Sequence, residues 1–181
     1  MLPRCLGMSH FLKLSLGLLF TFFSSGIFNT VPVLEYTPKI LDAVVNETKF
    51  WGPRLSLASA TFVSFDVEPF LTNLFTHADA SSSAYPPSRA RGLMPTNLYF
   101  AWILTVSDDL MHDAIRQSAA HLTQVAISEG QDVGNAPKYG NYAIYDTPLE
   151  RIFGENLPRL KGIKAQVDPN NVMALAGGWK I

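Results

Sequence analysis

The residues best suited to chemistry lie together in the segment 137–145, which reads Pro-Lys-Tyr-Gly-Asn-Tyr-Ala-Ile-Tyr. We expect this segment to be a strand, with Tyr139 and Asn141 on one face and Tyr142 on the other. A phenol can act as a general base if its pKa is lowered. Gly140 would let a flat ligand or another backbone approach. The alternative interpretation is that these aromatic residues only pack across neighbouring strands.

The elements expected around this segment follow an α+β order. Thr37 and Ser107 are short oxygen caps that favour helix starts, and Gly52-Pro53 is expected to stop the first helix. We therefore expect an α+β fold with a mixed or antiparallel sheet and helices packed on one side. The expected strands are 58–67, 97–106 and 138–146, and the expected helices are 38–50, 107–130, 148–153 and 156–167.

Periodicity predicts which faces of these elements are buried. In the strand 97–106 both faces are largely apolar, so the sheet is expected to be covered on both sides or to line a cavity. One face carries Leu98, Phe100, Trp102 and Leu104. The last helix is expected to turn Leu157, Leu160, Ile163 and Val167 inward. The sequence Thr147-Pro-Leu-Glu150 spells a capping box for the short helix before it.

Several common chemistries are not indicated. The chain has four histidines and one cysteine, Cys5, which excludes an internal disulfide and a Cys-based zinc site. His112 and His121 are expected on one helix at a spacing that does not bring them together, so no metal site is expected. The sequence also contains no GxSxG, P-loop or GxGxxG motif.

The overall composition narrows the class of partner. Fourteen basic and fifteen acidic residues give a formal net charge of −1, whereas binding to a phosphate backbone calls for a basic excess. We therefore expect no nucleic-acid partner. A hydrophobic fraction of 48% is ordinary for a globular protein, so disorder of the whole chain is not expected.

Residues 1–30 are expected to be an apolar leader. Arg4 and Lys13 flank the apolar run 14–23, and the small residues at 24–26 suit cleavage by a signal peptidase. A cleaved signal predicts an extracellular, secreted protein, in which Asn46-Glu-Thr48 is a usable glycosylation sequon. Two alternatives stay open: a membrane anchor formed by residues 11–28, and a gene model that begins in the wrong place.

The last 45 or so residues carry several motifs in a fixed order. The ordered motifs are Lys138-Tyr-Gly-Asn-Tyr142, Phe153-Gly-Glu-Asn156, Arg159-Leu160, Ile163-Lys164 and Val167-Asp-Pro-Asn-Asn171. This order resembles the C-terminal signature of berberine-bridge-enzyme-like FAD-linked oxidases of the vanillyl-alcohol-oxidase type. Phe153 stands where the family usually has Tyr. The ending Leu175-Ala-Gly-Gly-Trp-Lys-Ile181 resembles fungal members.

The resemblance implies an FAD-dependent oxidoreductase that acts on a small-molecule substrate. Such enzymes oxidise an alcohol, sugar or amine by hydride transfer to the flavin, which dioxygen then reoxidises. The resemblance implies catalytic roles for Tyr139 and Tyr142, one of them as the base. It also implies that Asn141 and Tyr142 lie at the cofactor.

The resemblance also suggests a domain organisation. Residues 31–136 are expected to be a partial substrate-binding (cap) domain, and 137–181 the berberine-bridge-enzyme-like segment. The FAD-binding domain of the family has no counterpart here, so we expect a C-terminal fragment whose exposed cap face could self-associate. The alternative is a non-catalytic binding module or pseudoenzyme with the cap fold, either secreted or membrane-anchored.

Overall fold

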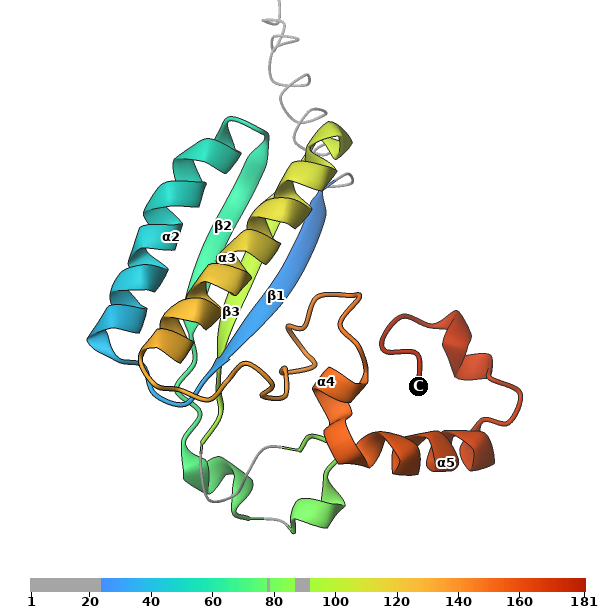
Figure 1. Ribbon diagram of the computed structural model, residues 1–181. Coiled ribbons are helices and arrows are strands. Elements are labelled where there is room, and N and C mark those ends of the chain that lie inside the picture. Colours follow the sequence, from blue (N-terminus) through green and yellow to red (C-terminus); the bar gives the residue numbers. More distant parts are fainter. Residues whose placement is uncertain (1–23, 78, 87–91) are drawn as a thin grey trace, which may run out of the picture.

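A three-stranded antiparallel sheet forms the centre of the molecule. The computed structural model describes residues 24–77, 79–86 and 92–181. The strands β1 (Ser25–Val33), β2 (Ala60–Val67) and β3 (Met94–Trp102) lie in the order β1-β3-β2. The helices α2 (Pro38–Ser56) and α3 (Asp108–Ser128) cover one face of this sheet (Figure 1). The predicted α+β class, with helices packed on one side, is confirmed.

The core lies between the central strand and these two helices. Leu98, Phe100 and Trp102 share one face of the strand, as predicted, and this face is fully buried against the helices. Met111 and Ile115 of α3 pack against them in the same cluster. Leu104, however, is 54% exposed, because β3 ends at Trp102 and a short 3-10 turn follows it. The predicted end of this strand was therefore wrong.

Strand β1 revises the expected boundary of the leader. Sequence patterning assigned residues 25–30 to the leader, but they form the first part of β1. This strand pairs with β3 in a register that runs from Ser25↔Trp102 to Val33↔Met94. Ile27 and Val31 are buried in the core, so this strand belongs to the folded domain. Residues 1–23, which include most of the candidate anchor 11–28, lie outside the described residues. Within the described residues, no helix is long and apolar enough to cross a membrane.

Helix α2 begins where predicted and ends later. The Thr37 hydroxyl accepts a hydrogen bond from the Ile40 N–H at 3.3 Å, which confirms the predicted cap. The helix then continues through Gly52 and Pro53, although these residues were expected to stop it. Leu55 is completely buried in the core, and this burial offsets the cost of proline in the last turns.

The segment 138–146 is not a strand, and that prediction was wrong. The N–H groups of Tyr142 and Ala143 both donate to the carbonyl of Tyr139, at 3.0 and 2.9 Å, which folds the chain into consecutive turns. Local turns therefore satisfy backbone groups that a sheet would otherwise pair. The short helix α4 (Glu150–Phe153) follows, but the Thr147 hydroxyl has no hydrogen-bond partner, so the predicted capping box does not form.

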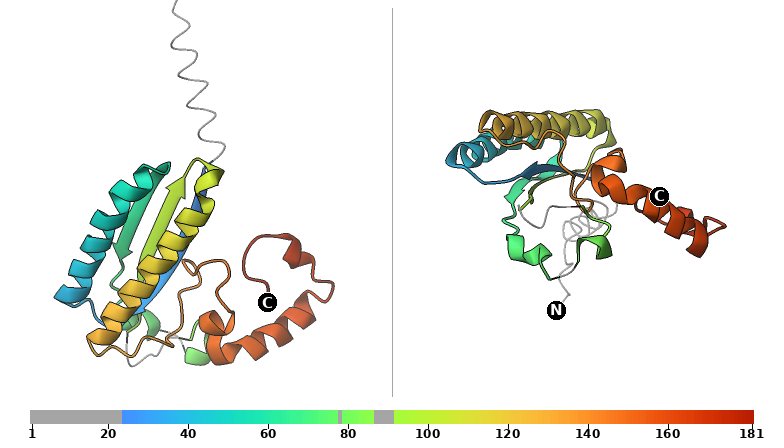
Figure 2. Two further views of the ribbon diagram at one scale, coloured as in Figure 1. Left: turned by 45° about the horizontal axis from the view of Figure 1, so that its top comes forward. Right: turned by 60° about the horizontal axis from the view of Figure 1, so that its bottom comes forward.

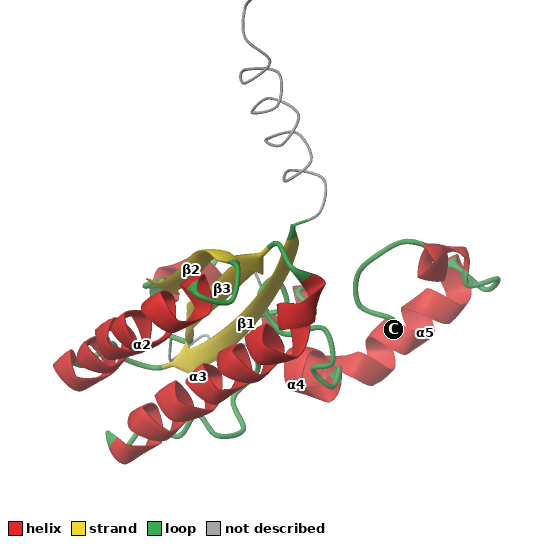
Figure 3. Cartoon of the chain, turned by 90° about the horizontal axis from the view of Figure 1, so that it is seen from above, coloured by secondary structure: helices red, strands yellow, loops and turns green. Residues whose placement is uncertain are grey.

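The C-terminal helix α5 (Leu157–Val167) extends away from the sheet, as the views from other directions show (Figures 2 and 3). Its predicted start and end are confirmed within one residue. Of its predicted inward residues, Leu157 is buried, whereas Ile163 is 44% and Val167 75% exposed. The tail after α5 turns back, and the Trp179 indole donates to the carbonyl of Gly140 at 3.0 Å.

Candidate functional site

The predicted site residues lie on the sheet face that α2 and α3 leave uncovered. On this face the rings of Phe28 in β1 and Tyr99 in β3 stack at 4.3 Å, with an angle of 9° between their planes. Tyr142 lies over the same ring of Phe28 at 6.1 Å. Phe62 of β2 lies 5.4 Å from Tyr99. Strand alternation explains the placement of Phe28, Phe62 and Tyr99, whose chain neighbours face the helices. Tyr142 reaches this face from the turn segment.

Tyr139 extends the group beyond the sheet. Its ring meets Phe70 at 5.5 Å, Tyr85 at 5.6 Å and Tyr142 at 5.3 Å, each time in an edge-to-face arrangement. Edge-to-face pairs of this kind stabilise the packing of aromatic side chains beyond their buried area. The resulting continuous group, called the aromatic face below, comprises Phe28, Phe62, Phe70, Tyr85, Tyr99, Tyr139 and Tyr142.

The structure brings together all three residues that the resemblance singled out. Tyr139 and Tyr142 were expected on opposite faces of a strand, but their rings touch, because the chain turns between them. The side-chain amide of Asn141 donates to the Tyr139 hydroxyl at 2.8 Å. Asn141 therefore fixes the position of the Tyr139 oxygen.

Sequence reasoning missed Glu68, which sets the chemistry of Tyr142. A hydrogen bond to the Glu68 carboxylate raises the pKa of Tyr142 to about 12, with smaller contributions from burial and nearby charge. Burial likewise raises the pKa of Tyr85 to about 12. Tyr142 is therefore a hydrogen-bond donor to Glu68. It does not suit the role of a base, because a phenolic base needs a lowered pKa.

A cavity of about 380 Å³ borders Asn141. Its lining residues are Gly26, Ile27, Phe28, Gly140, Asn141, Ala143, Tyr145, Gly178 and Trp179. None of these side chains carries a charge, and three of them are aromatic, so the cavity suits a flat ring and offers no cation to a diphosphate. Gly140 itself leaves no extra room for a ligand, because a Cβ there would lie 3.2 Å from Ile152 and 3.5 Å from the Trp179 indole.

The lining of this cavity can be compared with the parts of an FAD molecule. The described residues fit the ring part of a flavin, which Phe28, Asn141 and Trp179 would contact. The same cavity does not supply the cradle of N–H groups or cations that a dinucleotide's phosphates need. Among the described residues, this cavity therefore suits a flat ring but not the phosphates of a dinucleotide.

The helix histidines have structural partners. His112 packs edge-on against Trp102, with 5.8 Å between the ring centres, and His121 contacts the Glu47 carboxylate at 2.7 Å. In residues 24–77, 79–86 and 92–181, no three His, Cys, Asp or Glu side chains gather as a metal site would require.

The comparison with protein families agrees with the C-terminal motifs. Residues 138–176 match the family described as berberine and berberine-like. The match begins at Lys138 and contains Tyr139, Asn141, Tyr142, α4 and α5. A comparison with curated proteins finds no match. The molecule is thus an α+β domain that ends in a berberine-like segment, and the predicted resemblance to the berberine-bridge-enzyme-like FAD-linked oxidases is confirmed for that segment.

Proposed function

We propose that this chain is the C-terminal part of an FAD-linked oxidoreductase that oxidises a small alcohol, sugar or amine. The observation that carries the proposal is the match of residues 138–176, which include the Tyr-Gly-Asn-Tyr sequence at 139–142. When bound, FAD supplies the redox chemistry by accepting a hydride and passing the electrons to dioxygen. The residues of this chain position the substrate and the ring and exclude water.

Individual roles follow from the geometry around Asn141. Its amide donates to the Tyr139 hydroxyl at 2.8 Å and fixes the position of that oxygen. Tyr139 is therefore the better candidate for the base, while Tyr142, held by Glu68, donates a hydrogen bond. The aromatic face would pack against the flavin-binding part of the enzyme and keep solvent away from these hydroxyls.

We further infer that the protein is secreted, as the leader-like composition of residues 1–23 suggests. Because β1 begins at Ser25, removal of a leader without loss of the edge strand requires cleavage before that residue. N-terminal sequencing of protein recovered from culture medium tests this inference. A first residue after Ser25 would contradict it.

A second candidate function is a non-catalytic binding module with the same fold. The uncharged lining of the cavity beside Asn141 favours this alternative, because it suits a flat ring and offers no cation to the phosphates of FAD. In that case the cavity beside Asn141 would hold a flat small molecule without changing it.

Sequencing the transcript upstream of the codon for Met1 separates the two candidates. For the oxidoreductase we expect the reading frame to continue into glycine-rich, flavin-binding sequence. An in-frame stop codon immediately upstream would contradict the oxidoreductase and leave the binding module.

A further inference from the structure

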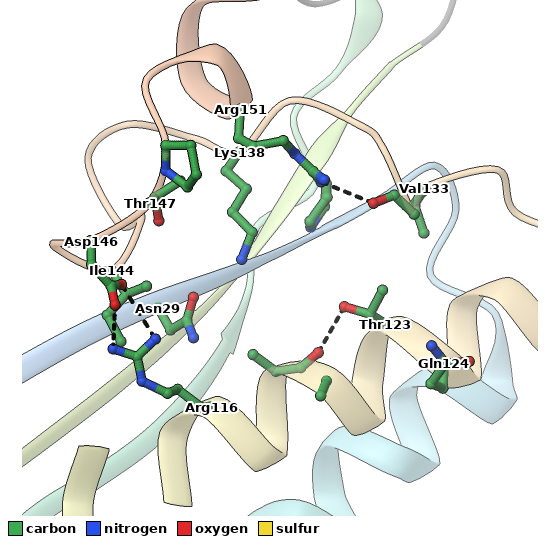
Figure 4. A pocket seen from close by; sticks show the side chains of 15 residues that line it. Asn29, Arg116, Thr123, Gln124, Val133, Lys138, Ile144, Asp146, Thr147 and Arg151 are labelled. Atoms are coloured by element: carbon green, nitrogen blue, oxygen red, sulfur yellow. Dashed lines mark hydrogen bonds and ion pairs between the residues drawn. The ribbon is translucent and has the colours of Figure 1, made fainter. Parts of the chain in front are cut away.

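A second cavity, of about 610 Å³, lies between α3 and the segment 133–151, away from the aromatic face. Three cationic side chains reach it: Arg116 from α3, Lys138 from the turn segment and Arg151 from α4 (Figure 4). Asp146 is the single carboxylate among its lining residues. The lining therefore has two more cations than anions, although the whole chain has a formal net charge of −1.

Two of the cations hold the walls of this cavity in place. Two nitrogens of the Arg116 guanidinium donate hydrogen bonds to the Asp146 carboxylate, at 2.8 and 3.3 Å. One terminal nitrogen of Arg151 donates to the carbonyls of Gly134 and Ala136, at 2.9 and 3.2 Å. These contacts fix the turn segment against α3 and α4, so the cavity is a formed feature of the fold.

Three polar atoms at the same cavity have no partner in the described part of the chain. The Lys138 Nζ points into its centre and makes no hydrogen bond or ion pair there (Figure 4). The Arg151 Nε and the Thr147 hydroxyl are buried and also unpaired, and Thr147 is only 8% exposed. Buried polar groups are normally paired, so two buried unpaired donors beside the half-buried Lys138 ammonium need an explanation.

The charges around the Lys138 amine are a second unusual feature of this cavity. Burial lowers the pKa of this amine, and the neighbouring charges of Arg151 and Arg116 lower it further. Asp146 opposes this effect only weakly, because its carboxylate is turned toward Arg116. The cavity is thus a cationic environment with one uncompensated ammonium group.

We propose that this cavity binds a small oxyanion, a carboxylate or phosphate group, through Lys138 Nζ, Arg151 Nε and the Thr147 hydroxyl. Such a group accepts several hydrogen bonds at once and neutralises the ammonium charge. The proposal rests on the cavity alone and is independent of the oxidoreductase function, because the aromatic face lies elsewhere.

Calorimetric titration of the full-length chain with inorganic phosphate, and separately with acetate, tests the proposal, with chloride at equal ionic strength as the reference. We expect saturable binding of at least one probe. Lys138→Gln should weaken it about tenfold or more, as expected for loss of a charge-assisted hydrogen bond. Lys161→Gln makes the same charge change on an exposed side chain of α5 and should leave the affinity within about twofold of the wild type.

Thr147→Val provides a second variant that keeps the side-chain shape and removes only the hydroxyl. We expect it to weaken binding several-fold, and it remains informative if Lys138→Gln does not fold. Saturation by phosphate alone assigns a phosphate group, and saturation by acetate alone assigns a carboxylate. The absence of saturable binding of both probes, or equal binding by the wild type and both variants, would overturn the proposal.

Discussion

The hydroxyl of Ser118 on α3 donates a hydrogen bond of 2.6 Å to the carboxylate of Glu47 on α2. The same carboxylate accepts from the Trp51 indole at 2.9 Å and faces His121 at 2.7 Å. Glu47 is only 8% exposed, so these partners replace its hydration. One buried carboxylate thereby joins the two helices that cover the sheet.

We therefore predict that Glu47→Ala lowers the free energy of unfolding by about 1–3 kcal/mol, because the Ser118 hydroxyl and the Trp51 indole lose their acceptor. Urea denaturation followed by circular dichroism measures this change. Asp42→Ala, on the exposed side of the same helix, should cost less than about 0.5 kcal/mol. Equal losses in the two variants would contradict the role assigned to Glu47.

The contact between Tyr142 and Glu68 predicts a change in an alkaline titration. With Glu68→Gln, the pKa of one tyrosine should fall from about 12 toward the ordinary value of 10.0, as phenolate absorbance would show. Because the folded pKa is the higher one, the folded state holds the extra proton, and stability should fall as the pH rises from about 10 to about 12. Glu150→Gln, at an exposed carboxylate, is the control, and an unchanged titration in Glu68→Gln would refute the contact.

Pro53 lies inside α2 and cannot donate to the carbonyl of Lys49 one turn earlier. We expect Pro53→Ala to restore that hydrogen bond and raise the free energy of unfolding by about 1–3 kcal/mol, within the range of proline's cost in helix interiors. Thermal unfolding measures the effect. A lower melting temperature in Pro53→Ala would show that the ring stabilises the end of this helix.

The C-terminal part exposes an apolar surface made of Ile163, Val167, Met173 and Leu175. Val167 is 75% and Leu175 90% exposed, and exposed apolar groups of this kind favour association. The strand face of Leu98, Phe100 and Trp102 does not add to this exposed surface, because α2 and α3 cover it.

We accordingly predict that the chain self-associates and that Val167→Asp with Leu175→Asp shifts it toward the monomer. Sedimentation velocity over a range of concentrations measures this shift. Leu57→Asp changes a side chain that is 92% exposed at the other end of the molecule and should leave association unchanged. A wild-type chain that stays monomeric throughout would refute the prediction.

Local signals predicted much of this fold, and non-local pairing explains the errors. The cap at Thr37 and the apolar stripe of α3 act within a few residues, so their positions could be predicted. Strand β1 was missed because it continues an apolar run, and only its pairing with β3 distinguishes it. The segment 138–146 is rich in tyrosine, which is typical of strands, although its backbone forms consecutive turns from which Tyr142 packs onto the sheet.

At the candidate site, too, contacts between residues distant in sequence could not be predicted. The proximity of Tyr139, Asn141 and Tyr142 could be expected because they are close in sequence and lie in the matched segment, whereas their roles stay a prediction. Glu68 reaches Tyr142 from a distant part of the chain, and no spacing in the sequence marks that contact. The grouping of Arg116 with Lys138 and Arg151 likewise depends on how α3 packs beside the turn segment.

The most direct test of the central claim is the absorption spectrum and intact mass of the native protein, isolated with an antibody against residues 157–181. As part of an FAD-linked oxidoreductase, it should have a mass above the 20.0 kDa of this chain and show the absorption bands of a flavin. A colourless protein of 20.0 kDa or less would contradict that claim.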